Sequence, residues 1–124
     1  MEEKLRKLML AMIAYNNGDA KRIQHFIKVH VLAKLIGEEE KLDAKTLYIL
    51  EAAALTHDIG IRNSEKKYGT CTGKQQEVEG PPEAEKLLQS LGFDAAVTER
   101  VCWLIAHHHT CLLYTSDAAD DLTR

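Results

Sequence analysis

Residues 51–60 read EAAALTHDIG and place an imidazole and a carboxylate, His57 and Asp58, together at the end of an alanine-rich run. The apolar positions between Asp43, a favourable N-cap, and His57 recur at helical spacing. Gly60 frees the backbone to bend, so both side chains can turn toward one cation. Metal coordination would offset the high cost of burying the carboxylate. The dipeptide alone is a weak signal, because such pairs more often form solvated turns or helix caps.

The rest of the chain also has helical periodicity, and no segment alternates polar and apolar residues as a strand does. We therefore predict an all-α bundle of about five helices. They are expected at residues 2–16, 19–37, 43–57, 80–92 and from 94 to the histidines at 107–109. The helix over 19–37 has a broad apolar arc and is predicted to be largely buried. Gly80-Pro81-Pro82 is expected to begin the fourth helix, because proline favours the first turn.

Residues 60–80 show no clear periodicity and are polar, basic and punctuated by glycine. A segment of this length between helices is usually a functional loop, which is our prediction here.

Composition places the 124 residues in one globular domain. No stretch approaches the ~20 apolar residues of a membrane span, and the N-terminus lacks a secretory leader's apolar run. The net charge of −3 gives no basic surface for a nucleic-acid polymer. Three scattered cysteines form neither a disulfide framework nor a paired metal knuckle. These features predict a cytoplasmic protein without membrane or nucleic-acid partners; the oligomeric state stays open.

The final residues, 111–124, read CLLYTSDAADDLTR. The first eleven of them resemble a translated transposase-type sequencing adapter. We therefore expect a native domain over 1–110 and a non-native tail over 111–124, whose Asp117, Asp120 and Asp121 carry no chemistry. The alternative is an ordinary polar C-terminal tail.

The other histidines fall on two of the expected helices. His25 and His30 both lie on the apolar arc of residues 19–37, so periodicity does not choose between them, and either can be a core histidine bonded to a carbonyl. Among residues 107–109, consecutive side chains point 100° apart, so one or two at most face a common site. His108 follows Ile105 by three positions and shares its apolar face. The alternative for these residues is an interaction with the helix dipole.

Taken together, His25 with Val29 and Ala33, then AAALTHDIG, then LIAHHH resemble the HD-domain metal-dependent phosphohydrolases over about residues 19–110. The resemblance implies an all-α fold, one or two divalent metals, and cleavage of phosphate esters or anhydrides, often of nucleotides. It also implies that His25 is the first metal ligand and that His57 and Asp58 are the defining pair. His108, or His107 in its place, resembles a later histidine of some two-metal members.

The sequence departs from the family's pattern at two points. Some two-metal members have a ligand in the form His-x-x-x-Gly, and Gln76 stands at that histidine position, four residues before Gly80. Glu77 or Glu79 can substitute as oxygen ligands. The family's closing aspartate follows the last histidine block, where this chain has the expected foreign tail. We therefore expect a truncated domain that lacks its closing helix and one ligand.

Mixed imidazole and carboxylate ligands suit Mn, Fe, Co, Ni, Zn or Mg at a hydrolytic site. Such a metal activates a water, which Asp58 can orient as ligand or base, making it the expected catalytic residue. Arg62, Lys66 and Lys67 follow closely and are expected to bind phosphate, although each of the three can instead be a solvated surface charge.

We therefore predict a phosphohydrolase acting on a nucleotide or small phosphorylated metabolite. Two alternatives stay open: a non-catalytic regulatory module that binds metal or nucleotide, and a helical bundle whose histidines are core or capping residues.

Overall fold

The structure is a computed structural model that describes residues 2–70 and 72–114, with side chains described as far as residue 107. Within these ranges every regular element is a helix, so the all-α prediction is confirmed. The helices are α1 (Glu3–Tyr15), α2 (Ala20–Glu39), α3 (Ala44–Thr56), α4 (Gly60–Tyr68), α5 (Gly73–Ser90) and α6 (Ala95–Tyr114). Five of them coincide with the expected helices, and α4 is the addition.

Local sequence explains where α2 and α3 begin. The Asp19 carboxylate accepts a hydrogen bond from the Arg22 backbone N–H, and the Asp43 carboxylate accepts one from Thr46 N–H. Each aspartate satisfies an N–H that the first helical turn leaves without a partner. The predicted N-cap at Asp43 is therefore confirmed, and Asp19 caps α2 in the same way.

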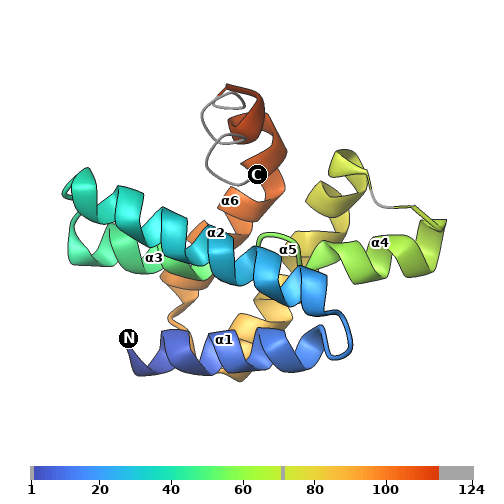
Figure 1. Ribbon diagram of the computed structural model, residues 1–124, viewed down its shortest axis with the longest axis horizontal. Coiled ribbons are helices and arrows are strands. Elements are labelled where there is room, and N and C mark those ends of the chain that lie inside the picture. Colours follow the sequence, from blue (N-terminus) through green and yellow to red (C-terminus); the bar gives the residue numbers. More distant parts are fainter. Residues whose placement is uncertain (1, 71, 115–124) are drawn as a thin grey trace.

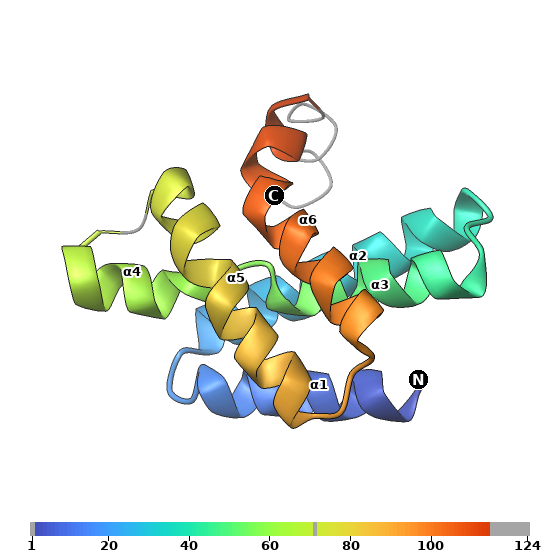
Figure 2. The ribbon, with the colours of Figure 1, turned by 180° about the vertical axis from the view of Figure 1, so that it is seen from behind.

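Helices α2 and α3 form a hairpin, so the start of α2 lies beside the end of α3 (Figure 1). Seen from behind, α5 and α6 pack on each other, and α1 lies beneath them (Figure 2). Fourteen buried apolar residues, drawn from every helix except α4, form one core: Leu5, Leu8, Met12, Phe26, Ala52, Ala53, Leu55, Ile59, Ala84, Leu88, Phe93, Val97, Val101 and Ile105. This core fixes the hairpin that carries the candidate site.

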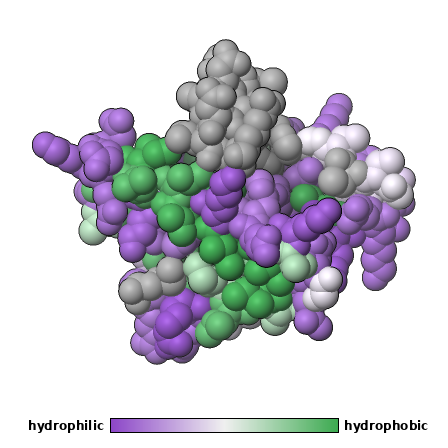
Figure 3. Space-filling view, viewed as in Figure 1, coloured by the Kyte–Doolittle hydropathy of each residue, from purple (hydrophilic) through white to green (hydrophobic). Residues whose placement is uncertain are grey.

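The prediction that α2 is largely buried is wrong. Its buried residues are Phe26, His30 and Gly37, whereas Val31 and Leu35 are 56% and 52% exposed. Figure 3 has the same view as Figure 1, in which α2 lies in front, and it shows exposed apolar side chains on this face of the molecule. The helix packs mainly on α3 and therefore covers only part of its apolar arc.

The predicted loop over residues 60–80 is also wrong. Helix α4 occupies residues 60–68 and ends at Gly69, whose φ of 72° is the left-handed conformation that glycine adopts readily. Helix α5 begins at Gly73 instead of at Gly80. A capping box, in which the Thr72 and Gln75 side chains each bond the other's backbone N–H, starts it there. Pro81 and Pro82 consequently lie inside α5.

Helix α6 extends beyond its predicted end. It was expected to stop at the histidines 107–109, but its backbone stays helical through Tyr114. No glycine or proline lies between His109 and Tyr114 to end it. None of the helices in the described ranges is long and apolar enough to cross a bilayer.

Candidate metal centre

Three predicted ligands come together where the α2–α3 hairpin meets the start of α4. His25 lies in the second turn of α2, His57 is the C-cap of α3, and Asp58 lies in the turn that leads into α4. His25 Nε2 and His57 Nε2 are each 3.2 Å from the same oxygen, Asp58 Oδ2. One ligand atom from each residue can be chosen so that all three lie within 4.8 Å of one another. The helices thus place two imidazoles and one carboxylate around a single point.

The three side chains differ in exposure. Those of His57 and Asp58 are 15% and 16% exposed, whereas that of His25 is 43% exposed. His57 and Asp58 therefore form the buried part of the cluster, and His25 lies on the side that faces solvent.

The Ala54 carbonyl fixes the orientation of the His57 ring. His57 Nδ1 lies 2.8 Å from Ala54 O. A carbonyl oxygen only accepts hydrogen bonds, so Nδ1 carries a proton. In the neutral imidazole the lone pair is then on Nε2, the atom that faces Asp58. A backbone carbonyl in this position is a typical support for a metal-ligating histidine.

The charges in the cluster are strongly coupled. Burial raises the pKa of Asp58, but the charge of His57 and hydrogen bonds from both histidines outweigh it and hold that pKa well below its usual range. Burial lowers the pKa of His57, but the charge and hydrogen bond of Asp58 and the Ala54 carbonyl raise it overall. The site thus keeps an anionic carboxylate and attracts positive charge, which protons supply when no metal is bound.

This donor set fits a divalent metal of the first transition row. Imidazole nitrogen is a suitable ligand for Zn, Cu, Fe and Ni, and carboxylate oxygen is also a suitable ligand for harder ions such as Mn and Mg. Three protein ligands also leave positions for water or substrate, as hydrolytic metal sites require.

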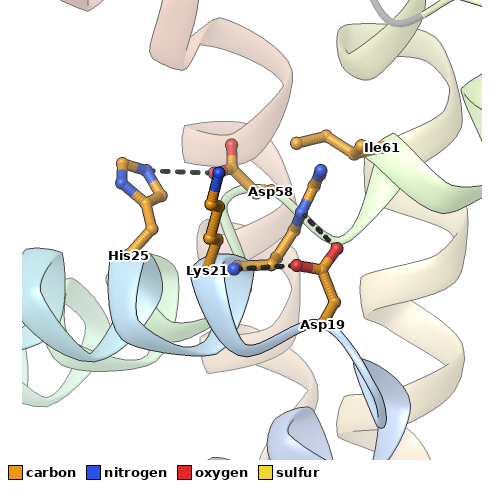
Figure 4. A pocket seen from close by; sticks show the side chains of 6 residues that line it. Asp19, Lys21, His25, Asp58 and Ile61 are labelled. Carbon is orange, nitrogen blue, oxygen red and sulfur yellow. Dashed lines mark hydrogen bonds and ion pairs between the residues drawn. The ribbon is translucent and has the colours of Figure 1, made fainter.

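A shallow pocket of about 320 Å³ opens beside the cluster. Its lining residues are Asp19, Lys21, Arg22, His25, Asp58 and Ile61. Figure 4 shows Lys21 and His25 rising from α2 on the same side, with His25 directed at Asp58. The pocket therefore combines two cations, Lys21 and Arg22, with two of the candidate ligands, His25 and Asp58.

Asp19 holds the Arg22 side chain in the pocket wall. Arg22 Nε is 3.5 Å from Asp19 Oδ2, so the carboxylate that caps α2 also orients the guanidinium. Arg22 Nη1 is buried and has no hydrogen-bond partner among the described residues. Leaving a buried cationic donor unpaired costs free energy, which an anion at this position would recover.

Lys21 and Arg22 were not among the residues predicted to form the site, although the sequence holds a signal for them. They precede His25 by four and three residues, the spacing that places side chains on one face of a helix. Charges on that face are therefore neighbours of the candidate ligand.

The cations predicted to bind phosphate have other surroundings. Arg62 Nη1 donates to Tyr15 O at 2.6 Å, Lys67 Nζ pairs with Glu79 Oε1 at 2.9 Å, and Lys66 is exposed. None of the three lines the described pocket.

The remaining ligand candidates are not in the three-residue cluster. Both oxygens of Glu79 are engaged, by Lys67 and by the Tyr68 hydroxyl at 3.0 Å. His107 is exposed, donates to Trp103 O at 2.7 Å and stacks on the Trp103 ring. Glu77 is half-buried on α5 and is not in the cluster. The side chain of His108 lies outside the described residues.

A model of the HD domain family matches residues 22–119. The match covers well over half of the chain and includes residues 111–119, whose foreign origin stays a prediction. No curated protein and no solved structure matches the chain significantly. The chain belongs to the HD-domain family of metal-dependent phosphohydrolases.

Proposed function

We propose that this protein is a metal-dependent phosphohydrolase that acts on a nucleotide or a small phosphorylated metabolite. One observation carries the proposal: two imidazole Nε2 atoms converge on the Asp58 carboxylate beside a pocket that two cations line. Ligands for a metal and groups for a phosphate are thus adjacent, as phosphoryl transfer to water requires.

His25, His57 and Asp58 would hold the metal. A bound ion of this class lowers the pKa of a coordinated water and polarises a phosphoryl oxygen. Asp58 stays anionic because both histidines stabilise its charge, so its carboxylate can also orient that water. Mn, Fe, Co, Ni, Zn and Mg are all compatible with the donors.

Lys21 and Arg22 are the proposed phosphate-binding residues. Their positions on the pocket wall support this role, as does Arg22 Nη1, which has no hydrogen-bond partner within the described part of the chain. A guanidinium matches the geometry of two phosphate oxygens. Arg62, Lys66 and Lys67, which the sequence favoured, have less support because they do not line the pocket.

The test is phosphate release by the full chain, treated with chelator and then supplied with Mn²⁺ or Co²⁺. Nucleoside mono-, di- and triphosphates and simple phosphomonoesters form the substrate panel. We expect metal-dependent release from at least one of them and its loss in His57→Ala. Arg22→Gln should raise KM, whereas Lys66→Gln, the exposed control, should not.

A non-catalytic module that binds metal or nucleotide is the second candidate. Gln76 favours it, since this buried residue stands where some two-metal members have a histidine ligand. Retained metal binding with no product from any substrate or metal would support this candidate and contradict the enzyme.

A further inference from the structure

The turn that carries Asp58 is held from the side by α1. The Tyr15 hydroxyl donates to the Ile59 carbonyl at 3.3 Å. In return, Arg62 Nη1 donates to the Tyr15 carbonyl at 2.6 Å, and the guanidinium carbon lies 5.3 Å from the Tyr15 ring centroid. Tyr15 thus contacts the residue immediately after Asp58 and the residue four positions after it.

These contacts suit the chemistry of both partners. Tyr15 is the last residue of α1, and the final turn of this helix has no basic residue of its own. Arg62 supplies a cation to the backbone carbonyl of Tyr15, one of the carbonyls that a helix C-terminus leaves without a partner. Burial and Glu83 raise the pKa of Tyr15 despite the opposing charge of Arg62, so its hydroxyl keeps the proton that it donates. The guanidinium also lies within cation–π range of the ring.

The opposite side of the turn meets α5. A Cβ on Gly60 would lie 2.7 Å from the backbone nitrogen of Gly80, so the two backbones are in direct contact. The turn also has two backbone hydrogen bonds, from Ile59 N–H to the Thr56 carbonyl at 3.0 Å and from Ile61 N–H to the Asp58 carbonyl at 3.1 Å, and the Ile59 side chain lies in the core. The contacts with α1 and α5 add to these local restraints.

We infer that Tyr15 and Arg62 are positioning residues that hold Asp58 at the point where His25 and His57 meet it. This inference rests on the proposed role of these three residues as metal ligands. It gives Arg62 a different task from phosphate binding, and the two roles predict different measurements. Substitution of a positioning residue should change the affinity for the metal. Substitution of a phosphate-binding residue should change KM and leave the affinity for the metal unchanged.

The experiment is a Co²⁺ titration of the chelator-treated full chain, followed by the visible absorption of the bound ion. The variants are Tyr15→Phe, Arg62→Met and Arg62→Lys. We expect Tyr15→Phe and Arg62→Met to lose roughly tenfold in Co²⁺ affinity, as the loss of residues that orient metal ligands does. Their spectra should shift because the Asp58 oxygen moves. Arg62→Lys restores a donor for the Tyr15 carbonyl and should recover part of the affinity.

Two control variants separate positioning from loss of stability. Lys66→Met removes an exposed cation from the same helix, and Asp43→Ala removes the N-cap at the far end of α3. Both variants should keep the wild-type Co²⁺ affinity and visible spectrum. Asp43→Ala should also have a lower unfolding midpoint, so it shows whether lost stability alone changes Co²⁺ binding.

Unchanged affinity and spectrum in both Tyr15→Phe and Arg62→Met would overturn the inference, and a raised KM in Arg62→Met would then assign Arg62 to phosphate. If Arg62→Met does not fold, Tyr15→Phe decides alone, because it removes a single oxygen atom. Failure of the wild-type chain to bind Co²⁺ would overturn the proposed metal site instead.

Discussion

Two histidines on α2, five residues apart, have different surroundings. His25 is 43% exposed and contacts Asp58, whereas His30 is 2% exposed and its Nε2 lies 3.0 Å from Glu51 Oε1. Helical spacing puts both on one broad apolar arc, so the sequence could not choose between them. The different surroundings depend on α3. Its Glu51 contacts the His30 ring, and its C-cap, His57, lies beside the His25 ring.

His30→Ala should lower stability and spare the metal site. The substitution leaves the Glu51 carboxylate buried without its imidazole partner, which costs about 3 kcal/mol or more. Urea denaturation measures this loss, and Co²⁺ titration at a temperature where the variant is folded measures the affinity. A His30→Ala protein of wild-type stability that no longer binds Co²⁺ would reverse the assignment of the two histidines.

The Asp58–His57 pair should make the stability of the metal-free protein depend on pH. His57 has a raised pKa in the folded state, so its contribution is present below 6.5 and is lost as pH rises through the folded value. Asp58 has a lowered pKa, so its contribution is present above 3.8 and is lost in acid.

The pair should therefore raise the free energy of unfolding between pH 3.8 and pH 6.5, and this contribution should decline toward pH 8. Asp58→Asn should remove most of this dependence, as urea denaturation at pH 5.5 and pH 8 would show. An equal decline in the variant would mean that other groups cause it.

At the scale of helices, the sequence predicted five elements and missed α4. The reason is physical: this helix buries only Gly60, Ile61 and Ser64, so it has no full apolar stripe to detect. Signals for its end were present, because Lys66 and Lys67 lie in its last turn and Gly69 follows. Pro81 and Pro82 predict that α5 starts at Gly80, but the Thr72–Gln75 capping box starts it seven residues earlier, at Gly73.

The crossing of α4 and α5 predicts unequal effects of two glycine substitutions. A Cβ on Gly60 meets the backbone of Gly80 at 2.7 Å, whereas a Cβ on Gly80 meets a methyl group of Ile105 at 2.9 Å. The Cγ2 methyl of the buried, β-branched Ile105 can shift only slightly, but the backbones of α4 and α5 can separate only if whole helices move. Gly60→Ala should therefore lower the free energy of unfolding by about 1–3 kcal/mol, the range of overpacking, and weaken Co²⁺ binding.

Gly80→Ala is the matched variant and should lose less stability, because alanine also favours the helix. Its Co²⁺ affinity should stay unchanged, since its Cβ does not press on the turn. Equal losses of stability and affinity in both variants would show that the crossing does not position Asp58.

At the scale of the whole molecule, the candidate site joins two stretches that are far apart in sequence. The end of α1 and the start of α2 form one stretch, and the end of α3 and the start of α4 form the other (Figure 1). The family resemblance identified His25, His57 and Asp58 as ligand candidates. It did not identify Lys21 and Arg22, because only the folded hairpin shows which cations lie on the pocket.

Metal binding should stabilise the folded chain by mass action, because the unfolded chain does not hold the three ligands together. Free metal at a hundred times its Kd adds about 2.7 kcal/mol to the free energy of unfolding. Thermal unfolding of the chelator-treated chain should therefore shift upward on addition of Mn²⁺ or Co²⁺ and return when EDTA is added. A midpoint that does not respond to either ion would contradict a site in the folded protein.

The most direct test of the central claim is a Co²⁺ titration of the wild-type full chain beside His57→Ala, with His30→Ala as the matched histidine control. We expect saturable binding by the wild-type chain and by His30→Ala, and loss of binding in His57→Ala. Binding that survives in His57→Ala, or no binding by the wild-type chain, would contradict the metal centre formed by His25, His57 and Asp58.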